Sequence, residues 1–412
     1  MTADEPDAAL PGLARAAARK SGAAARARRA KQAAPVELAE VDPVARVVVD
    51  LPLAHLDRTF DYAVPASMSE QAVPGVRVKV RFAGQDVDGF VVERVSASEH
   101  DGRLAPLRRA VGAEPVLTPA IADLCGRIAE RYAGVSSDVR RLAVPPRHAT
   151  AEKQPSPSAP ALETLDVPED DWAAYPAAPA FLRHLRTGGG PRAVWDAAPG
   201  EDWPRLLAQL AAATLAGCRG TVICVPDHRD VARVDAALLE VLGPDQHVTL
   251  QAEAGPGPRY REFLLVSRGA RRIVVGTRSA AFAPVHDLGL VVIWDDGDDL
   301  HAEPRAPYPH TREVLLERAG IEDCAVLVGS FSRSVEADQL LQTGWAKEIS
   351  APRPTVRDRA LIGVAGPGHR HDPHSGAARG VCTSTGPRSR PHRTASCASV
   401  GTRAAPEWGS RW

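Results

Sequence analysis

Apolar and polar residues alternate most clearly near residue 80. Between residues 76 and 82, apolar side chains alternate with three cations, Arg77, Lys79 and Arg81. A period of two places the apolar set on one face of a strand and the cations on the other. Together with a turn at residues 83–86, such patterns predict a small β-rich domain with strands at residues 47–51, 60–64, 76–82 and 89–95.

The period becomes helical after this domain. Thr118 can cap a helix whose first position is Pro119, and apolar residues then recur three or four positions apart. A second, shorter helix is expected to begin near Ser136. We therefore expect a helical part over residues 116–150, following the β-rich domain over residues 46–115.

Short apolar runs alternate with amphipathic stretches between residues 180 and 354. The apolar runs predict strands at residues 222–225, 248–251, 273–276, 290–294 and 325–328. The stretches between them predict helices at residues 204–216, 231–242, 260–267 and 312–319. Buried strands that alternate with helices are typical of a doubly wound parallel sheet. The expected fold class is therefore multidomain α/β.

Three segments have no such period. Residues 1–45 contain a run of cations without an acid from Arg15 to Lys31, which either contacts DNA phosphates or is a solvated, disordered arm. Residues 151–179 are rich in Pro, Ala and acid and predict a linker or insertion. Residues 355–412 have too few apolar side chains for a core, so we expect a disordered tail, either genuine or translated out of frame.

Charge and cysteine content narrow the function classes. The chain has 50 Lys and Arg against 51 Asp and Glu, a net charge of −1, so DNA binding would have to come from local patches. Its 6 cysteines form no Cys-x-x-Cys pair and predict buried thiols, with no zinc ribbon. No apolar run approaches the roughly 20 residues that span a bilayer. We expect a cytoplasmic protein without a membrane partner.

Two stretches carry distinctive motifs. Residues 58–62 read Arg-Thr-Phe-Asp-Tyr and precede the strand at residues 75–82, and residues 276–284 read Gly-Thr-Arg-Ser-Ala-Ala-Phe-Ala-Pro. Both resemble signatures of the PriA family of replication restart proteins, in the family's order and spacing. The resemblance extends from about residue 47 to residue 354. It implies a domain that binds DNA 3′ ends, then a winged-helix domain, then the first RecA-like lobe of a helicase.

The resemblance directs attention to a small set of DNA-binding candidates. Phe60, Asp61 and Tyr62 are the candidates for the pocket that holds the 3′ end. The candidate phosphate contacts are Lys79, Arg81, Arg108 and Arg109. Alternatives remain open for all three residues. Asp61 is also compatible with a turn between strands. Alternation places the rings of Phe60 and Tyr62 on one face of the strand, and that face could belong to the core. The strand cations Arg77, Lys79 and Arg81 are more often a solvated strand face than a set of phosphate contacts.

The resemblance also implies a phosphate loop, which aligns with residues 197–204. Of the family's Gly-x-x-Gly-x-Gly-Lys-Thr pattern only Gly200 is kept, while Trp203 and Pro204 stand where the lysine and threonine should be. Such a loop needs backbone N–H groups and a lysine for the phosphates, and a hydroxyl for Mg²⁺. ATP is therefore not expected to bind.

Two further helicase motifs are altered. Trp294 stands at the family's Mg²⁺ ligand, and Asp295 or Asp296 beside it could hold a metal in principle, although surface carboxylates at the end of a strand are the simpler interpretation. Residues 329–337 lack the Thr-Pro centre of the family's coupling motif. The chain also ends before the family's second lobe with its zinc-binding cysteines. We expect no ATP, magnesium or zinc, as in the actinobacterial-type branch that lacks helicase motifs.

Three functions are compatible with this sequence. The leading interpretation is a replication restart protein that binds forked or single-stranded DNA without helicase activity. Its further partners would be single-strand-binding protein and other primosome proteins. One alternative is an ATP-dependent 3′→5′ DNA helicase of the PriA type. The other is a frameshifted fragment without a cellular role.

Overall fold

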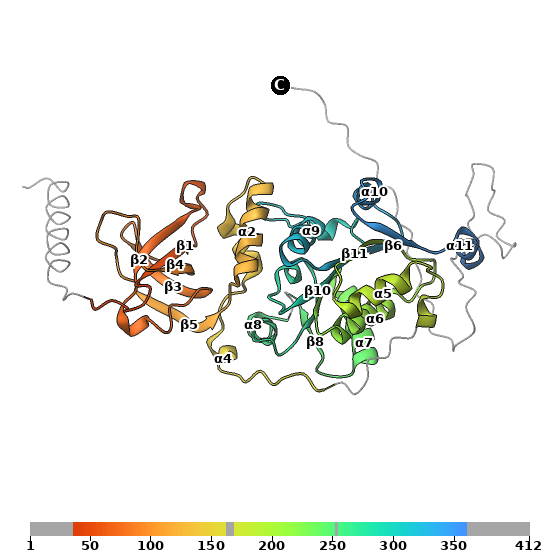
Figure 1. Ribbon diagram of the computed structural model, residues 1–412, viewed down its shortest axis with the longest axis horizontal. Coiled ribbons are helices and arrows are strands. Elements are labelled where there is room, and N and C mark those ends of the chain that lie inside the picture. The colour runs from red at the N-terminus through yellow and green to blue at the C-terminus, as the bar shows by residue number, and fades with distance from the viewer. Residues whose placement is uncertain (1–35, 162–168, 252–253, 361–412) are drawn as a thin grey trace, which may run out of the picture. The chain divides into compact units, whose positions relative to one another are not determined.

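The computed structural model describes residues 36–161, 169–251 and 254–360 (Figure 1). The chain divides into two compact units, Met1–Pro352 and Arg353–Trp412. The second unit contributes one described helix, α11 (Arg353–Arg359), which covers the start of the segment expected to be a disordered tail. The expected basic arm up to residue 35 and the tail from residue 361 lie outside the described residues.

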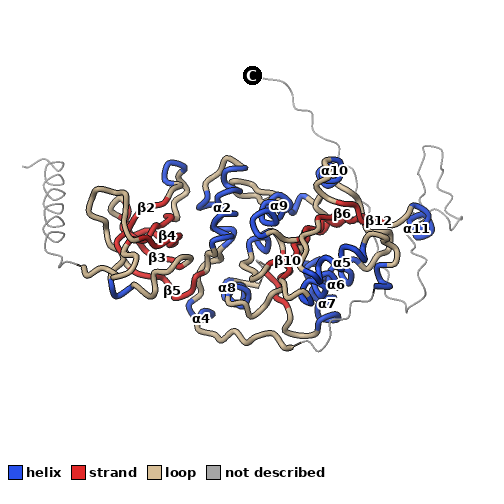
Figure 2. The backbone as a smooth tube through the Cα atoms, in the orientation of Figure 1, coloured by secondary structure: helices blue, strands red, loops and turns tan. Residues whose placement is uncertain are grey.

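Five antiparallel strands form the sheet of the N-terminal domain, in the order β2-β1-β4-β3-β5 (Figure 2). They are β1 (Val44–Val49), β2 (Thr59–Ala63), β3 (Val76–Phe82), β4 (Gln85–Val95) and β5 (Arg109–Pro115), with short 3-10 turns η1 (Ala54–Leu56) and η2 (Ala66–Met68). Ala83 and Gly84 make the two-residue turn between β3 and β4, with φ of 44° and 84°. Val47, Val78 and Val80 belong to this domain's own core. The four predicted strands are confirmed.

Helices follow the sheet as the sequence predicts. They are α2 (Pro119–Arg131), α3 (Ser136–Ala143) and α4 (Ala149–Glu152). The Thr118 hydroxyl accepts a hydrogen bond from the N–H of Ile121 at 3.3 Å, which caps α2. Leu124 of α2 and Val139 of α3 share a core with residues of the following lobe. Residues 116–150, all of which are described, contain helices and no strand.

Seven parallel strands form the sheet of the lobe, in the order β12-β6-β11-β10-β7-β9-β8. They are β6 (Arg192–Asp196), β7 (Gly220–Cys224), β8 (His247–Leu250), β9 (Ile273–Gly276), β10 (Leu288–Trp294), β11 (Ala325–Ser330) and β12 (Lys347–Ser350). The helices are α5 (Ala178–Thr187), α6 (Trp203–Ala216), α7 (His228–Leu242), α8 (Pro256–Ser267), α9 (Thr311–Glu322) and α10 (Val335–Gln342), with 3-10 turns η3 (Glu169–Trp172), η4 (Arg278–Phe282) and η5 (Asp299–His301).

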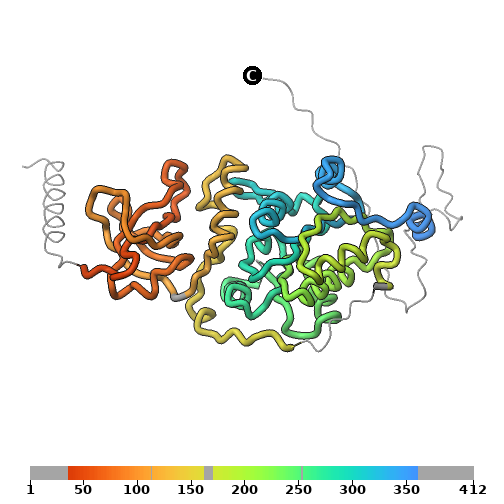
Figure 3. Tube along the Cα trace, viewed as in Figure 1, coloured from red at the N-terminus to blue at the C-terminus, as the bar shows by residue number. Residues whose placement is uncertain are grey.

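The lobe has two cores, one on each face of its sheet. One contains the inward residues of α5, α6 and α7, and the other contains those of α8, α9, α2 and α3. Figure 3 traces the chain through these helices by colour. Because strands buried on both faces need apolar residues throughout, they appear in the sequence as continuous apolar runs. The predicted doubly wound parallel sheet is confirmed.

Two boundaries predicted from the sequence are wrong. Within the expected linker at residues 151–179, Trp172 and Tyr175 are each 1% exposed and lie in the core of the lobe. At the start of the chain, Ala39 is buried in the core of the β domain, so the described residues 36–45 belong to that domain. Isolated apolar anchors in a Pro- and acid-rich stretch have no period, which is why patterning missed them.

The thiols follow their prediction in part. Cys125, Cys224 and Cys324 are buried, and burial raises the pKa of each thiol to about 12. Cys218 is exposed, contrary to the expectation. Cys382 and Cys397 lie outside the described residues.

Candidate nucleic-acid interface

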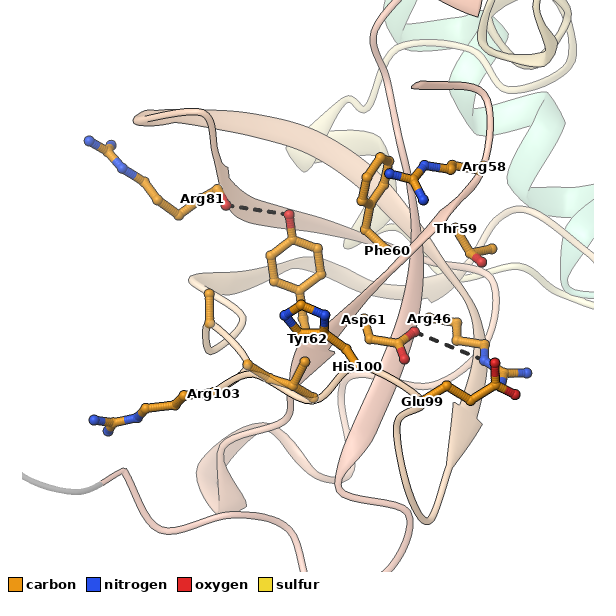
Figure 4. A pocket seen from close by; sticks show the side chains of 12 residues that line it. Arg46, Arg58, Thr59, Phe60, Asp61, Tyr62, Arg81, Glu99, His100 and Arg103 are labelled. Atoms are coloured by element: carbon orange, nitrogen blue, oxygen red, sulfur yellow. Dashed lines mark hydrogen bonds and ion pairs between the residues drawn. The ribbon is translucent and has the colours of Figure 1, made fainter. Parts of the chain in front are cut away.

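An open cavity of about 620 Å³ lies beside β2, the strand at one edge of the β domain's sheet (Figure 4). All three residues predicted for the 3′-end pocket, Phe60, Asp61 and Tyr62, line it. Its charged lining consists of the cations Arg46, Arg58, Arg81 and Arg103 and the acids Asp61 and Glu99. Cations are therefore in excess, and a negatively charged ligand is favoured.

Asp61 is held in place on the cavity wall. Its Oδ2 accepts a hydrogen bond from the Ser98 hydroxyl at 2.5 Å, and its Oδ1 lies 4.0 Å from Nε of Arg46. The Asp61 side chain is 19% exposed, so a ligand can reach it. Arg46 faces Asp61 because β1 and β2 pair with these two residues opposite each other. The carboxylate keeps lone pairs for a further donor.

The two aromatic residues differ in their surroundings. Tyr62 is 4% exposed and belongs to the domain core, where burial raises the pKa of its phenol. Its hydroxyl donates a hydrogen bond to the carbonyl of Arg81 at 3.3 Å. Phe60 is half-buried and meets Phe82 edge-on at a centroid distance of 4.9 Å. The Arg58 guanidinium carbon lies 4.8 Å from the centroid of the Phe60 ring. Tyr62 therefore forms the wall, and Phe60 is the ring that a base could approach.

The predicted phosphate contacts do not gather at one place. Arg81 lines the cavity and pairs with Asp86 at 3.1 Å, while Arg108 lies 3.7 Å from the same carboxylate. Lys79 pairs with Asp88 at 2.9 Å and lines a different cleft. Arg109 is exposed and lines neither of these cavities.

Sequence reasoning missed several cavity residues. Arg46, Arg58, His100 and Arg103 all line the cavity. Arg46 could have been found by pairing the first two predicted strands, since the register places it opposite Asp61. His100 and Arg103 come from the connection between β4 and β5, where the sequence has no period to place them.

The stretch that aligns with the family's phosphate loop, residues 197–204, follows the first strand of the lobe. It joins β6 to α6, and the connection to β7 then passes over β11 and β10 in the sheet. Ligands of doubly wound sheets bind at such a switch point, beyond the carboxyl ends of the strands. Gly200 has a φ of 74° and the Asp202 side chain caps α6, so the local chain keeps a strand–turn–helix geometry.

Indole rings fill this switch point. Trp203, which is 2% exposed, stacks on Trp294, with ring centroids 4.2 Å apart and planes 7° from parallel. Trp195 lies 5.5 Å from Trp294, again between ring centroids. Glycine suits position 329, because a Cβ there would stand 3.0 Å from Cε3 of Trp195. The space above the ends of β6, β10 and β11 is thus packed with aromatic carbon.

The acids after β10 are engaged differently. Asp296 is 1% exposed, accepts from Arg312 Nη1 at 2.8 Å and accepts from the Ser334 hydroxyl at 2.7 Å. The interpretation as a surface carboxylate is therefore wrong for Asp296, although Asp295 is exposed. Within the described ranges, no group of three or more His, Cys, Asp or Glu could hold a metal ion. Bulky buried indoles and a carboxylate already paired with arginine do not fit a magnesium nucleotide.

The altered coupling motif is also tied into the fold. Arg333 forms ion pairs with Asp196 and Glu348, and with Asp338 at 3.1 Å. Hydrogen bonds to these carboxylates, that to Asp196 above all, raise the pKa of the Arg333 guanidinium. Asp196 ends β6 and Glu348 lies in β12, so Arg333 joins the two neighbouring strands to the start of α10.

Comparison with known proteins shows what this part of the chain is similar to. The family model of the PriA 3′DNA-binding domain (3′BD) matches residues 46–145, a stretch that contains the entire cavity. The chain is a relative of PriA. The matched stretch runs through α2 and α3, so the division into a β-rich domain and a winged-helix-like part stays a prediction.

Whole-chain relatives agree with the domain match. The chain is 48% identical over 317 residues to the "Probable replication restart protein PriA" of Mycobacterium tuberculosis (strain CDC 1551 / Oshkosh), covering 76% of this chain and 48% of that protein. It is 46% identical over 319 residues to the same-named protein of Mycobacterium leprae (strain TN), covering 76% and 49%. It is 25% identical over 323 residues to the "Replication restart protein PriA" of Treponema pallidum (strain Nichols), covering 74% and 46%.

The PriA-related chain spans about half the length of these curated relatives. Among the helices of the described residues, none has both the length and the apolar character needed to cross a bilayer.

Proposed function

We propose that this PriA-related chain binds DNA at a free 3′ end through the Asp61 cavity and acts in replication restart without hydrolysing ATP. The observation that carries the proposal is a half-buried carboxylate in a cavity where cations are in excess. A carboxylate repels phosphate, so within a DNA-binding domain it has to recognise another group. Forked DNA, single-strand-binding protein and other primosome proteins in the cytoplasm belong to the same proposal.

A 3′-hydroxyl is the group that suits Asp61. The hydroxyl is a donor, and an ionised carboxylate accepts from it strongly. Arg46 and Arg81 on the cavity wall would hold the adjacent phosphates, and these contacts carry no sequence preference. The half-buried ring of Phe60 would stack on the terminal base, a contact worth roughly 1–3 kcal/mol. Recognition would then depend on the end of the strand and not on its sequence.

The filled switch point supports the part of the proposal that concerns ATP. Trp203 and Trp294 occupy the positions of a phosphate-binding lysine and a metal ligand, and their stacked rings are buried. A triphosphate would have to displace both rings and would meet Glu201 and Asp202 at the mouth of the loop. We therefore favour a scaffold role for the lobe over a helicase role.

Substitution of Asp61 tests the proposed end recognition. Asp61→Ala should weaken binding to forks with a free 3′-hydroxyl by about tenfold or more, since hydrogen bonds to charged groups contribute about 1.5–3 kcal/mol. Binding to the same forks with a 3′-phosphate should hardly change. Fluorescence anisotropy on both substrates measures the difference, and Asp123→Ala on the exposed surface of α2 is the matched control. Equal losses on both substrates would show that Asp61 only supports the fold.

A further inference from the structure

A second cleft, of about 580 Å³, lies between the sheet of the β domain and the end of α3. Residues of β3, β4 and β5 form one wall, and the other wall comes from α3 and the residues after it. Its volume lies within the range of roughly 300–1,000 Å³ typical of ligand pockets. The cleft has an excess of positive charge, with the cations Arg77, Lys79, Arg140, Arg141 and Arg147 against the acids Asp50 and Asp88.

Three of these cations already have acidic partners. Lys79 pairs with Asp88 at 2.9 Å, and Arg141 pairs with Asp50 at 3.0 Å. Arg147 pairs with Glu152 just beyond the cleft. Both acids of the lining are therefore engaged, and the remaining positive charge belongs to Arg77 and Arg140.

Arg77 and Arg140 have no acidic partner within 4.0 Å in the described part of the chain. Arg77 stacks on Phe90, with its guanidinium carbon 5.2 Å from the ring centroid, and donates to the carbonyl of Pro145 at 3.3 Å. Burial is the main cause that lowers the pKa of the Arg77 guanidinium. The direct partners are neutral, and the charges of Asp88 and Asp50 only partly oppose the effect of burial on this pKa. Desolvating a charge is unfavourable unless an opposite charge balances it.

Arg140, which also lines the cleft, has neutral direct partners too, and Asp57 and Asp50 oppose the effect of its burial only in part. The residue is 6% exposed, with Nη1 donating to the Ser136 hydroxyl at 2.6 Å and Nη2 donating to the carbonyl of Val49 at 3.3 Å. Its Nε is buried and has no hydrogen-bond partner among the described residues. Burial lowers the pKa of this guanidinium too. Two desolvated guanidinium groups that share one cleft create a site for an anion.

We propose that this cleft binds the phosphodiester backbone of a DNA strand, as a contact separate from the 3′-end cavity. The proposal rests on the proposed function in one respect, namely that the chain binds DNA. Continuity between the two sites favours a strand over a free anion. Lys79 of the cleft and Arg81 of the cavity lie on the same face of the sheet, two residues apart on β3. Two residues of a strand span about 7 Å. One strand can therefore reach both.

An apolar group in the cleft suits a nucleic-acid backbone as well. Phe90 and Val144 line the cleft but are buried, whereas Pro146 is exposed, so Pro146 is the apolar group that a sugar edge would contact. Phosphate contacts of this kind position a strand without reading its bases.

Charge-neutralising variants test the cleft. Arg77→Gln and Arg147→Gln, alone and combined, are compared with Arg127→Gln on the exposed surface of α2, which does not line the cleft. Arg77→Lys, which keeps the charge, should recover part of the affinity. The affinity of each variant is measured for three substrates of equal length. They are closed circular single-stranded DNA, a linear strand with a 3′-hydroxyl and the same strand with a 3′-phosphate. Melting temperatures verify folding. If Arg77→Gln unfolds, Arg147→Gln remains informative because its side chain is 32% exposed.

The expected result is a similar loss on all three substrates. The double variant should bind each about tenfold more weakly, and the slope of log K against log salt should fall by about 0.7 for each phosphate of a single strand that the variant no longer neutralises. Unchanged affinity for circular DNA in the folded double variant would overturn the proposal. The proposal would also be overturned if inorganic phosphate competed as well as DNA for the cleft at the same ionic strength. A double variant that lost affinity for a hexa-aspartate peptide but kept its affinity for DNA would overturn it too.

The two sites can fail independently. A selective effect of Asp61→Ala on 3′-hydroxyl ends with no effect of the cleft variants would leave the end cavity and remove the cleft. The reverse outcome would keep the cleft and remove end recognition by Asp61. Absence of binding to all three substrates by the wild-type chain would remove both.

Discussion

His301 is enclosed at the end of η5, where its Nε2 lies 2.9 Å from the carbonyl oxygen of Trp294. Burial is the largest cause that lowers the pKa of the imidazole to about 4, and the nearby His310 lowers it further. The hydrogen bond to Trp294 and the charges of Asp298 and Asp296 oppose the shift. The ring is therefore neutral at pH 7, and Nε2–H donates to the carbonyl. In this way His301 holds the backbone of one of the two stacked tryptophans.

The lowered pKa of His301 predicts a loss of stability in mild acid. The unfolded chain takes up a proton near pH 6.5 and the folded chain only near pH 4, so stability falls as the pH drops from 6.5 towards 4. Between pH 7 and pH 5 this amounts to about 2 kcal/mol. His301→Gln should flatten the dependence of melting temperature on pH over that range, whereas His55→Gln at an exposed histidine should not. An equally steep dependence in both variants would contradict the prediction.

The place of a single residue in the fold was predictable from the sequence only where the residue belonged to a motif or to a periodic apolar pattern. Alternation indicated that Phe60 and Tyr62 share a face, but not that Tyr62 lies in the core while Phe60 stays half-buried at a sheet edge. The burial of Asp296 depends on Arg312, a residue of α9 that is distant in sequence. Pairings of this kind are set by the tertiary fold, and no local pattern reveals them.

At the scale of elements, the turn between β6 and α6 leads into the buried ring of Trp203 where a phosphate loop would have its lysine. We therefore predict that Mg-ATP does not bind to the chain. Isothermal titration calorimetry should show only heats of dilution. Trp203→Lys with Pro204→Thr should not produce binding, because Trp294 still stands at the metal-ligand position. Fork binding by the same samples shows that the protein is folded. A micromolar dissociation constant for the wild-type chain would support the helicase alternative.

Elements with strong apolar periods were found, including the edge strands β2 and β8, whereas β5, β6 and β12 were missed. The five predicted lobe strands correspond to β7, β8, β9, β10 and β11, and β9 has the predicted bounds. The edge strand β12 has one buried residue, Ile349, and β6 beside it has polar residues at both ends. In the other sheet, β5 was missed because Gly112, with a φ of 89°, interrupts its alternation. Strands that bury less apolar surface give a weaker signal.

At the scale of the whole molecule, the end of the chain can be tested by deletion. Removing residues 361–412 should leave the melting temperature and DNA affinity almost unchanged, because that stretch has too few apolar residues to form a core. Thermal unfolding and fork-binding titrations on the full and shortened chains measure this. A drop of several degrees in the shortened chain would show that the stretch is folded into the protein.

The order of the domains was predictable, and their exact limits were not. A change of period from two to 3.6 indicated the passage from the β domain to α2, and the structure has it at Thr118. The entry into the lobe was misplaced because Trp172 and Tyr175 act as isolated anchors ahead of α5. Such anchors contribute through the area that each ring buries, which composition averaged over a segment does not reveal.

The stacked rings of Trp203 and Trp294 also restrict how the lobe can change over generations. Each ring packs against the other, so a small polar residue in place of one leaves a void, with a loss of about 3–5 kcal/mol. A lysine at position 203 alone would also bury an ammonium group with no anion beside it. A domain stable by roughly 5–15 kcal/mol tolerates few such steps. Replacing either ring on the way to a phosphate loop would thus weaken the protein before it gains a nucleotide contact, which opposes a stepwise return of the loop.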